Sequence, residues 1–254
     1  MKITCESAAP RAADHTRARA RRAALPRCHI MLASLRRRLL AIDACALCDA
    51  SGKVARVVET VRPLKHGYKM AGVARTVSIN GDFLGVLQAI RDARTDEVIM
   101  IDTGWSNAQS SGESLRWPMT GGMFGELLAM EAQRKGLAGL VIDGNIRDTA
   151  AQRTLTIPIF SRGSHPNAGT ASHPGEHQQA VQMGSVRVEP GDFVLGDDDG
   201  VVVATPEELE AWLPKAEAIV ERESEIFRAV QSGKPLLDQY PISDLATNMS
   251  APHP

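Results

Sequence analysis

The sequence predicts a mixed α/β sandwich built as a single domain, and three observations support that fold class. Segments with strand and helix patterns alternate in the first two thirds of the chain, whereas strand patterns cluster between residues 182 and 204. With 254 residues and 43% hydrophobic content, the chain can bury a sizeable core without a second domain. Since only 4% of the residues are aromatic, aliphatic side chains and Met must form most of that core.

The chain is expected to divide into a folded body and two tails. Residues 1–33 read as a basic, disordered extension, residues 34–231 as the folded domain, and residues 232–254 as a C-terminal arm or disordered tail. Residues 1–38 carry ten Lys or Arg against two acids, although the whole chain has a net charge of -1. Such a head is typical of a targeting segment, a nucleic-acid contact or a solvated tail. We expect residues 1–30 to be dispensable, with Met31 as an available internal start.

Membrane insertion and a disulfide framework both lack support in the sequence. No apolar run approaches the roughly 18 residues of a membrane span. The cysteines all lie in the first fifth of the chain, at Cys5, Cys28, Cys45 and Cys48. The spacing of Cys45 and Cys48 suits a redox or zinc site, but no second ligand pair matches it, which favours two helix cysteines packing as small apolar side chains. A reduced, cytoplasmic setting fits best.

The first half of the body alternates helix and strand patterns. In order, we expect a helix over 35–49 ended by the Ala-Ser-Gly at 50–52, a strand over 69–79, a helix over 83–93 capped by the Asn-Gly-Asp at 80–82, and a buried strand over 97–102.

The second half begins with a helix and then collects strands. In order, we expect a helix over 126–135 stopped by Gly136, strands over 139–143, 157–160, 182–188 and 192–195, an Asp-Gly turn over 196–200, a strand over 201–204, and a long amphipathic helix over 206–231 with a Thr-Pro-Glu-Glu start.

Three polar segments allow both a functional and an ordinary interpretation. The loop over 105–119 is either a lid or a surface insertion. The aspartates at 197–199 could bind a cation, but Asp-Gly is a strong hairpin signal, and we favour the hairpin. The loop over 162–177 carries side chains that can ligate a metal, namely His165, His173, Glu176 and His177. Because no helix or strand pattern would hold them at a fixed spacing, we favour a solvated or structural role for them.

The most informative stretch is residues 120–148, because it joins a glycine loop, a helix, a buried strand and an Arg-Asp pair. Gly121, Gly122 and Gly125 precede the helix, whose first turn has unpaired N–H groups and the positive end of the helix dipole. Such a helix start suits a small carboxylate or phosphate. The apolar strand that follows is expected to bring Arg147 and Asp148 to the same end of the sheet.

This arrangement resembles the RraA-like family, which includes metal-dependent 4-hydroxy-4-methyl-2-oxoglutarate aldolases. The specific part of the resemblance is Gly125-Glu126, then twenty residues, then Arg147-Asp148. It extends over roughly residues 39 to 230, and further matching phrases are Gly72–Val77, Ile157–Phe160 and Val188–Val203.

The resemblance implies a fold, an assembly and a chemistry. The fold would be an RraA-like β/β/α swivelling-type sandwich, assembled as a homotrimer or hexamer. The activity would be a divalent-metal-dependent lyase that cleaves 4-hydroxy-4-methyl-2-oxoglutarate, or a related 4-hydroxy-2-oxo acid such as 4-carboxy-4-hydroxy-2-oxoadipate, to pyruvate. Oxaloacetate decarboxylation would be a side activity.

The same resemblance assigns residue roles. Asp148 would hold Mg²⁺ or Mn²⁺, and Arg147 would stabilise the oxyanion. The carboxylate of the 2-oxo acid would bind at the start of the helix, formed by Gly125, Glu126, Leu127 and Leu128. Glu126 would act as the base, although characterised aldolases often carry Asp at that position. Family members also use an acidic residue of a neighbouring subunit, for which the candidates are Glu221, Glu223 and Glu225.

An alternative is a non-catalytic protein of the RraA type, which binds and inhibits an endoribonuclease. The complete set of Glu126, Arg147 and Asp148 favours the enzyme, because an inhibitor has no need for a metal carboxylate. The sequence carries no nucleotide-binding fingerprint, and we expect no direct contact with nucleic acid or membrane.

Overall fold

A computed structural model describes residues 32–105 and 121–239. The predictions for residues 1–31 of the basic head, for the loop over 106–119 and for the end of the C-terminal tail therefore lie outside the described residues. Residues 32 and 33, expected to end the disordered extension, are instead helical. A helix over residues 32–41 comes first. The elements that follow are α2 (Ala44–Ala50), β1 (Arg56–Val57), β2 (Arg62–Pro63), β3 (Met70–Ser78), α3 (Leu84–Asp92), β4 (Glu97–Asp102), α6 (Glu126–Arg134), β5 (Gly139–Ile146), α7 (Thr149–Gln152), β6 (Ile159–Ser164), β7 (Glu176–His177), β8 (Val181–Met183), β9 (Val186–Val188), β10 (Phe193–Asp197), β11 (Gly200–Ala204), α8 (Pro206–Gln231) and the 3₁₀ turn η1 (Leu236–Gln239).

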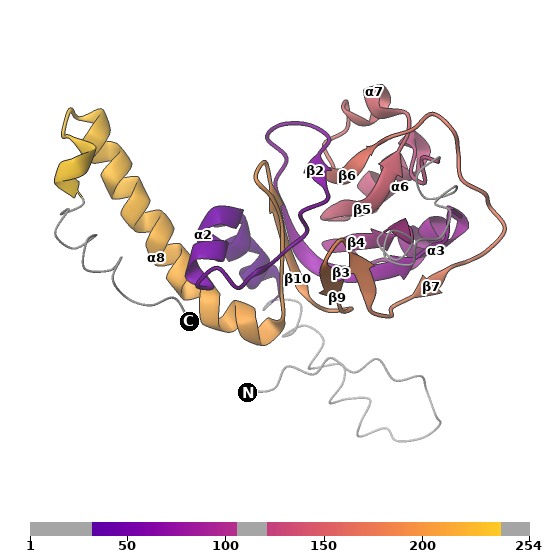
Figure 1. Ribbon diagram of the computed structural model, residues 1–254, viewed down its shortest axis with the longest axis horizontal. Helices are drawn as coiled ribbons and strands as arrows, with labels where there is room; N and C mark the ends of the chain where they lie inside the picture. The colour runs from indigo at the N-terminus through magenta and orange to yellow at the C-terminus, as the bar shows by residue number, and fades with distance from the viewer. Residues whose placement is uncertain (1–31, 106–120, 240–254) are drawn as a thin grey trace, which may run out of the picture.

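Within the described residues, a nine-stranded mixed sheet forms the centre of the molecule (Figure 1). The strand order is β1-β11-β10-β3-β4-β5-β6-β2, with β7 pairing beside β3 and a separate β8-β9 hairpin. Strands β3, β4, β5 and β6 run parallel, whereas β10, β11, β1 and β2 pair antiparallel. The predicted mixed α/β class is thus confirmed.

The parallel strands are apolar because both faces of this part of the sheet are covered. All eight residues of β5 are buried, as are five of the six residues of β4. Parallel pairing aligns Asp102 with Asp143 at the carboxyl ends of these strands. Polar groups at the carboxyl ends of parallel strands converge on one edge of the sheet, which is where the candidate site lies.

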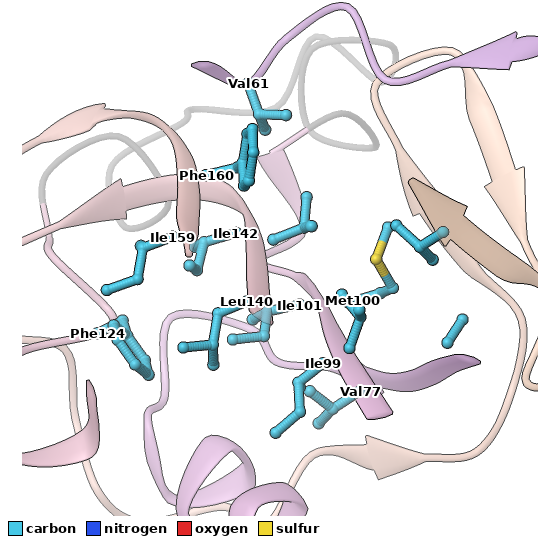
Figure 2. Packing of buried hydrophobic residues seen from close by; sticks show 14 of the residues in the cluster. Val61, Val77, Ile99, Met100, Ile101, Phe124, Leu140, Ile142, Ile159 and Phe160 are labelled. Atoms are coloured by element: carbon cyan, nitrogen blue, oxygen red, sulfur yellow. The ribbon is translucent and has the colours of Figure 1, made fainter. Parts of the chain in front are cut away.

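Two hydrophobic cores lie on the sheet. The larger core joins the parallel strands to α3, α6 and the β8-β9 hairpin. Figure 2 shows side chains of β4, β5 and β6 in this core, together with Phe124 from the loop before α6. Phe124 is fully buried, so the glycine loop is anchored in the core at the residue before Gly125. The second core packs residues of β3, β10 and β11 against α2, α8 and the helix over 32–41.

Helix α8 is the longest element and follows the sequence prediction closely. Thr205 caps it in a complete capping box with Glu208, and Leu209, Leu213 and Ala216 pack into the second core. The second half of α8 projects away from the sheet and from the α6-α7 region (Figure 1). Exposed apolar side chains follow along this arm at Phe227, Val230, Leu236 and Leu237. None of the helices in the described part of the chain has the length and apolar character of a membrane span.

The structure corrects several element boundaries. The single helix predicted over 35–49 is two helices, because the Asp43 side chain accepts a hydrogen bond from Ala46 N at 2.7 Å and starts a new helix there. The strand predicted over 157–160 begins and ends later, at Ile159–Ser164. The single strand predicted over 182–188 is the β8-β9 hairpin, which turns at Gly184 with φ of 62°.

Strand β5 also differs from its prediction over 139–143, since it continues to Ile146. The Asp-Gly-Asn at 143–145 interrupts the apolar pattern by which a strand is recognised, and the pairing with β6 shifts register between Ile142 and Asn145. Arg147 and Asp148 therefore follow the strand directly.

The predicted Asp-Gly hairpin is confirmed, with Asp197 and Gly200 as cross-strand partners. The aspartates have separate partners. Asp197 accepts a hydrogen bond from Ala44 N at 2.7 Å, and Asp198 accepts from Gly67 N at 2.9 Å. These contacts give the side chains structural roles in capping α2 and holding the turn at Gly67.

The prediction for the cysteines is correct for one of them. Cys48 is half-buried against the second core, whereas Cys45 is exposed at the start of α2. Partial desolvation, assisted by the Asp199 carboxylate, raises the pKa of the Cys45 thiol to about 11. That thiol is therefore neutral and unreactive at physiological pH.

Candidate functional site

The glycine loop lies along the end of β5, and backbone hydrogen bonds join the two segments. Met123 N donates to Asn145 O at 2.9 Å, and Arg147 N donates to Phe124 O at 2.9 Å. The loop leading to α6 and the backbone leading to Asp148 therefore form one unit. The prediction that the Arg-Asp pair and the start of the helix converge is confirmed.

Gly122 lies in the most crowded part of this unit. A Cβ on this residue would lie 2.7 Å from His165 O and 2.9 Å from the Cβ of Arg147, so only glycine fits without displacement. Gly122 N donates to Asn167 O at 2.7 Å, and His165 N donates to Ile146 O at 2.9 Å. The segment over residues 165–168 thus packs against both Gly122 and the end of β5.

Helix α6 begins at Gly125, whose extended backbone caps the helix without a side-chain hydrogen bond. The first bond of the helical ladder is Ala129 N to Gly125 O at 3.1 Å, so the N–H groups of Glu126, Leu127 and Leu128 precede the ladder. Glu126 N points toward Asp148 Oδ2 at 3.5 Å. The start of α6 thus faces a carboxylate of the protein itself, which the helix dipole stabilises.

Arg147 and Asp148 form an ion pair, with 3.2 Å between Arg147 Nε and Asp148 Oδ2. Their side chains are 37% and 35% exposed. An ion pair this exposed adds at most about 1 kcal/mol to stability. Folding therefore does not require the pair, and its position beside the start of α6 calls for a functional explanation.

The backbone of Asp148 lies in the left-handed helical region, with φ of 56° and ψ of 36°. This conformation is uncommon for residues other than glycine and costs on the order of 1 kcal/mol, although Asp tolerates it better than most. It turns the chain sharply between β5 and α7. The Asp148 side chain does not cap α7 and lies toward Gly125 instead.

Gly125 leaves the space in which the Asp148 carboxylate lies. A Cβ on Gly125 would be 2.7 Å from Asp148 Oδ2 and 3.5 Å from Arg147 Cγ. Any larger residue would push the carboxylate away from the helix start. The glycine of the Gly-Glu and Arg-Asp motif is therefore needed so that the Asp148 carboxylate can lie against the start of α6.

The donor set at this point suits a hard divalent cation. Asp148 supplies a partly exposed carboxylate, and Mg²⁺ binds through one or two carboxylates while keeping water or substrate oxygens as its other ligands. No cluster of three or more His, Cys, Asp or Glu side chains within residues 32–105 and 121–239 could hold a metal. Asp148 alone could hold Mg²⁺ or Mn²⁺ only where water or substrate oxygens complete the coordination.

The predicted acidic partners on α8 do not lie near this site in the same chain. Glu221, Glu223 and Glu225 are exposed on the projecting half of the helix, and Glu225 pairs with Arg222 at 3.4 Å. Figure 1 places this half of α8 at the opposite end of the molecule from α6 and α7.

The histidines of the loop over 162–177 have ordinary local partners. His165 Nδ1 accepts a hydrogen bond from Asn167 N at 3.2 Å, and His177 Nε2 lies 2.8 Å from Pro174 O. His173 lies beside Asp82, with 3.7 Å between His173 Nδ1 and Asp82 Oδ2.

Asp82 is a buried carboxylate that the sequence assigned only to helix capping. It accepts hydrogen bonds from Leu84 N and His173 N at 2.9 Å each and from Thr170 Oγ1 at 2.9 Å, and also from Ser172 N. Burial alone would raise the pKa of Asp82, but these bonds outweigh it and lower the pKa to about 2. The ionised carboxylate therefore fastens the segment over 170–173 to the start of α3.

A second buried group lies at the carboxyl ends of β4 and β5. Asp143 is fully buried, pairs with Arg162 at 2.7 Å, and accepts hydrogen bonds from Thr60 Oγ1 at 2.7 Å and Gly184 N at 3.0 Å. Burial, together with the nearby Asp143 charge, raises the pKa of Asp102. These contacts tie β5 to the β1-β2 connection and to the β8-β9 hairpin. Sequence reasoning missed them, because no spacing pattern marks partners this far apart in the chain.

Comparison with known proteins identifies the family. The family model RraA-like, described as Aldolase/RraA, matches residues 44–203. A protein of Halalkalibacterium halodurans named "Putative 4-hydroxy-4-methyl-2-oxoglutarate aldolase" is 34% identical over 176 residues, which cover 69% of this chain and 78% of that protein.

Two solved structures share the fold at 25% identity each. The RNA-processing inhibitor RraA of Thermus thermophilus aligns with a TM-score of 0.53 over 62% of this chain and 89% of its own. RraAS2 of Streptomyces coelicolor, titled an unusual member of the RNase ES inhibitor RraA protein family, aligns with a TM-score of 0.61 over 77% of this chain and 95% of its own. The chain belongs to the RraA-like family.

Proposed function

We propose that the protein is a divalent-metal-dependent lyase that cleaves 4-hydroxy-4-methyl-2-oxoglutarate, or a related 4-hydroxy-2-oxo acid, to pyruvate. The observation that carries the proposal is the position of the Asp148 carboxylate, next to Arg147 and to the N-terminus of α6. The names of the similar aldolases support the reaction class. Because members of one fold can differ in activity, the proposal rests on the site rather than on the fold.

The reaction needs a place for the negative charge that develops on the keto oxygen when the carbon-carbon bond breaks. A divalent cation bound at Asp148 would polarise that oxygen. Arg147 stays charged at every physiological pH, and its planar guanidinium can donate two parallel hydrogen bonds to the oxyanion. The Arg147–Asp148 contact places this donor beside the carboxylate proposed to bind the cation.

The start of α6 would hold the carboxylate of the 2-oxo acid. The N–H groups of Glu126, Leu127 and Leu128 precede the helical ladder, and the helix dipole favours an anion there. Glu126 N now faces Asp148 Oδ2 at 3.5 Å, a weak contact that a substrate carboxylate could replace.

Proton abstraction from the C4 hydroxyl requires a base. Glu126 is the first residue of α6 and is partly exposed, which makes its carboxylate the candidate within the chain. The glutamates of α8 are the candidates from a neighbouring subunit. In this proposal the protein is a homotrimer or hexamer, because the projecting half of α8 carries exposed carboxylates and apolar side chains that the described residues of one chain leave uncovered.

The competing proposal is a non-catalytic inhibitor of an endoribonuclease, which the names of the two solved RraA structures suggest. Pyruvate release separates the two functions. The purified protein is incubated with 4-hydroxy-4-methyl-2-oxoglutarate, 4-carboxy-4-hydroxy-2-oxoadipate and oxaloacetate, each with Mg²⁺ and with a chelator.

The lyase proposal predicts turnover of at least one aldol substrate with Mg²⁺ and none with the chelator. It also predicts slower decarboxylation of oxaloacetate. No pyruvate from any of the three, together with inhibition of an endoribonuclease in a cleavage assay, would establish the alternative.

A further inference from the structure

Gln152, the last residue of α7, makes contacts that connect the two halves of the candidate site. Its side chain is fully buried. The amide nitrogen donates to Phe124 O at 3.3 Å and also to Arg147 O. Phe124 immediately precedes Gly125, and Arg147 O belongs to the peptide bond that leads to Asp148. One side chain thus holds the glycine loop and the Arg-Asp turn at the same time.

The backbone at this point needs such support. Asp148 adopts the left-handed conformation, which persists only where neighbouring contacts hold it. Gln152 N donates to Asp148 O at 3.1 Å, and the Gln152 side chain holds the carbonyl on the other side of Asp148. The peptide bonds before and after Asp148 are therefore both fixed by Gln152.

The orientation of the amide follows from its partners, because two carbonyl oxygens can accept only from the NH₂ group. Gln152 Oε1 then faces the other way and is buried without a hydrogen-bond partner among the described residues. A buried oxygen without a partner lowers stability, so a side chain selected for stability alone would be apolar here. The polar side chain is thus better explained by the two carbonyls that it positions.

We propose that Gln152 is a positioning residue, which holds the left-handed turn at Asp148 against the start of α6 so that the carboxylate of Asp148 lies beside Gly125. The role rests on the proposed function of Arg147 and Asp148. Residues that fix the orientation of a metal-binding side chain typically change metal affinity about 10- to 100-fold when they are replaced.

The test replaces Gln152 with Met, which has a similar length and shape but cannot donate a hydrogen bond. Phe124 O keeps the bond from Arg147 N, and the buried oxygen without a partner is removed. Arg147 O loses the side-chain donor, which opposes this gain, so we expect a melting temperature close to the wild-type value. Hydrogen exchange of the peptide that covers residues 145–153 should be at least about tenfold faster, and Mn²⁺ measured by titration should bind about tenfold more weakly.

Gln133→Met is the matched control. Gln133 also bonds backbone through its side-chain amide, accepting from Thr156 N at 2.7 Å and Ile157 N at 3.2 Å, but it lies at the far end of α6. This variant should exchange faster near residue 156, while Mn²⁺ affinity and exchange over 145–153 stay at the wild-type level.

Each outcome decides the proposal. Wild-type exchange over 145–153 in Gln152→Met overturns it, and so does faster exchange spread over the whole chain with a lower melting temperature, which marks a merely structural residue. A wild-type protein that binds no Mn²⁺ contradicts the proposed metal-dependent function. The exchange measurement, which needs no metal, still decides whether Gln152 positions the turn.

Discussion

Asp148 Oδ2 lies only 2.7 Å from the point that a Cβ of Gly125 would occupy, so the carboxylate proposed to bind a cation fills the space left by a missing side chain. The two residues are 23 positions apart in the sequence, and backbone hydrogen bonds between the glycine loop and the end of β5 hold them side by side.

Gly125→Ala tests this relationship. The added methyl group should displace the Asp148 carboxylate, because the contact is too close for both groups to remain. We expect kcat/KM for pyruvate release to fall at least about tenfold, while the free energy of unfolding changes by less than about 1 kcal/mol, since the Asp148 side chain is partly exposed. Wild-type kinetics in a folded Gly125→Ala protein would show that the carboxylate does not act from this position.

Arg147→Ala should lower kcat/KM at least about 10²-fold, because the oxyanion loses its donor. The melting temperature should change little, since the ion pair with Asp148 is exposed and worth at most about 1 kcal/mol. Arg134→Ala is the control, because Arg134 forms an even more exposed pair with Glu131 at the far end of α6. Equal effects of the two substitutions on turnover would remove Arg147 from the mechanism.

Asp82→Asn should lower stability at neutral pH, because an amide cannot accept all of the hydrogen bonds that reach the buried carboxylate. The folded pKa of about 2 lies below the unfolded value, so the ionised group stabilises the fold at neutral pH, and this contribution is lost as the pH falls from about 4 to about 2. We expect a difference on the order of 2 kcal/mol between wild type and variant in urea unfolding at pH 7. The difference should shrink at pH 3, and a constant difference would contradict the assignment.

The shared-site proposal concerns the projecting half of α8. Changing Glu221, Glu223 and Glu225 to Gln one at a time should give at least one variant that loses turnover while it still binds Mn²⁺ and remains oligomeric. The reason is that these carboxylates cannot reach the Arg147–Asp148 pair of their own chain. Full activity in all three, or in an isolated monomer, would leave Glu126 as the principal base.

The sequence predicts best those parts of the fold whose signals are local. Strand β3 alternates small and apolar residues, β4 has a continuous apolar run, α6 is bounded by glycines, and α8 starts with a capping box, so the predicted bounds of each agree with the structure within one or two residues. The helix and strand ends that were predicted wrongly depend on tertiary contacts or backbone irregularities, which the pattern of apolar residues does not reveal. The end of β5 is the example, because the Asp-Gly-Asn at 143–145 reads as a turn although these residues continue the strand.

The same distinction holds for the candidate site. Gly125, Glu126, Arg147 and Asp148 were recognised because they form a motif with a fixed spacing, and the structure brings them together. Gln152 and Asp82 were missed in their supporting roles, because their partners are backbone groups that any residue type carries. The αL conformation of Asp148 was also missed, since Asp is common in turns of many kinds.

Whether the Asp148 carboxylate acts in the reaction is tested most directly by comparing the wild-type protein with Asp148→Asn. The measurement is Mg²⁺-dependent pyruvate release from 4-hydroxy-4-methyl-2-oxoglutarate. Asn has nearly the shape of Asp and tolerates the left-handed backbone, so this substitution removes the charge with little effect on the turn. We predict that the variant stays folded and loses at least about 10²-fold in kcat/KM. Equal Mg²⁺-dependent turnover in the two proteins would contradict it.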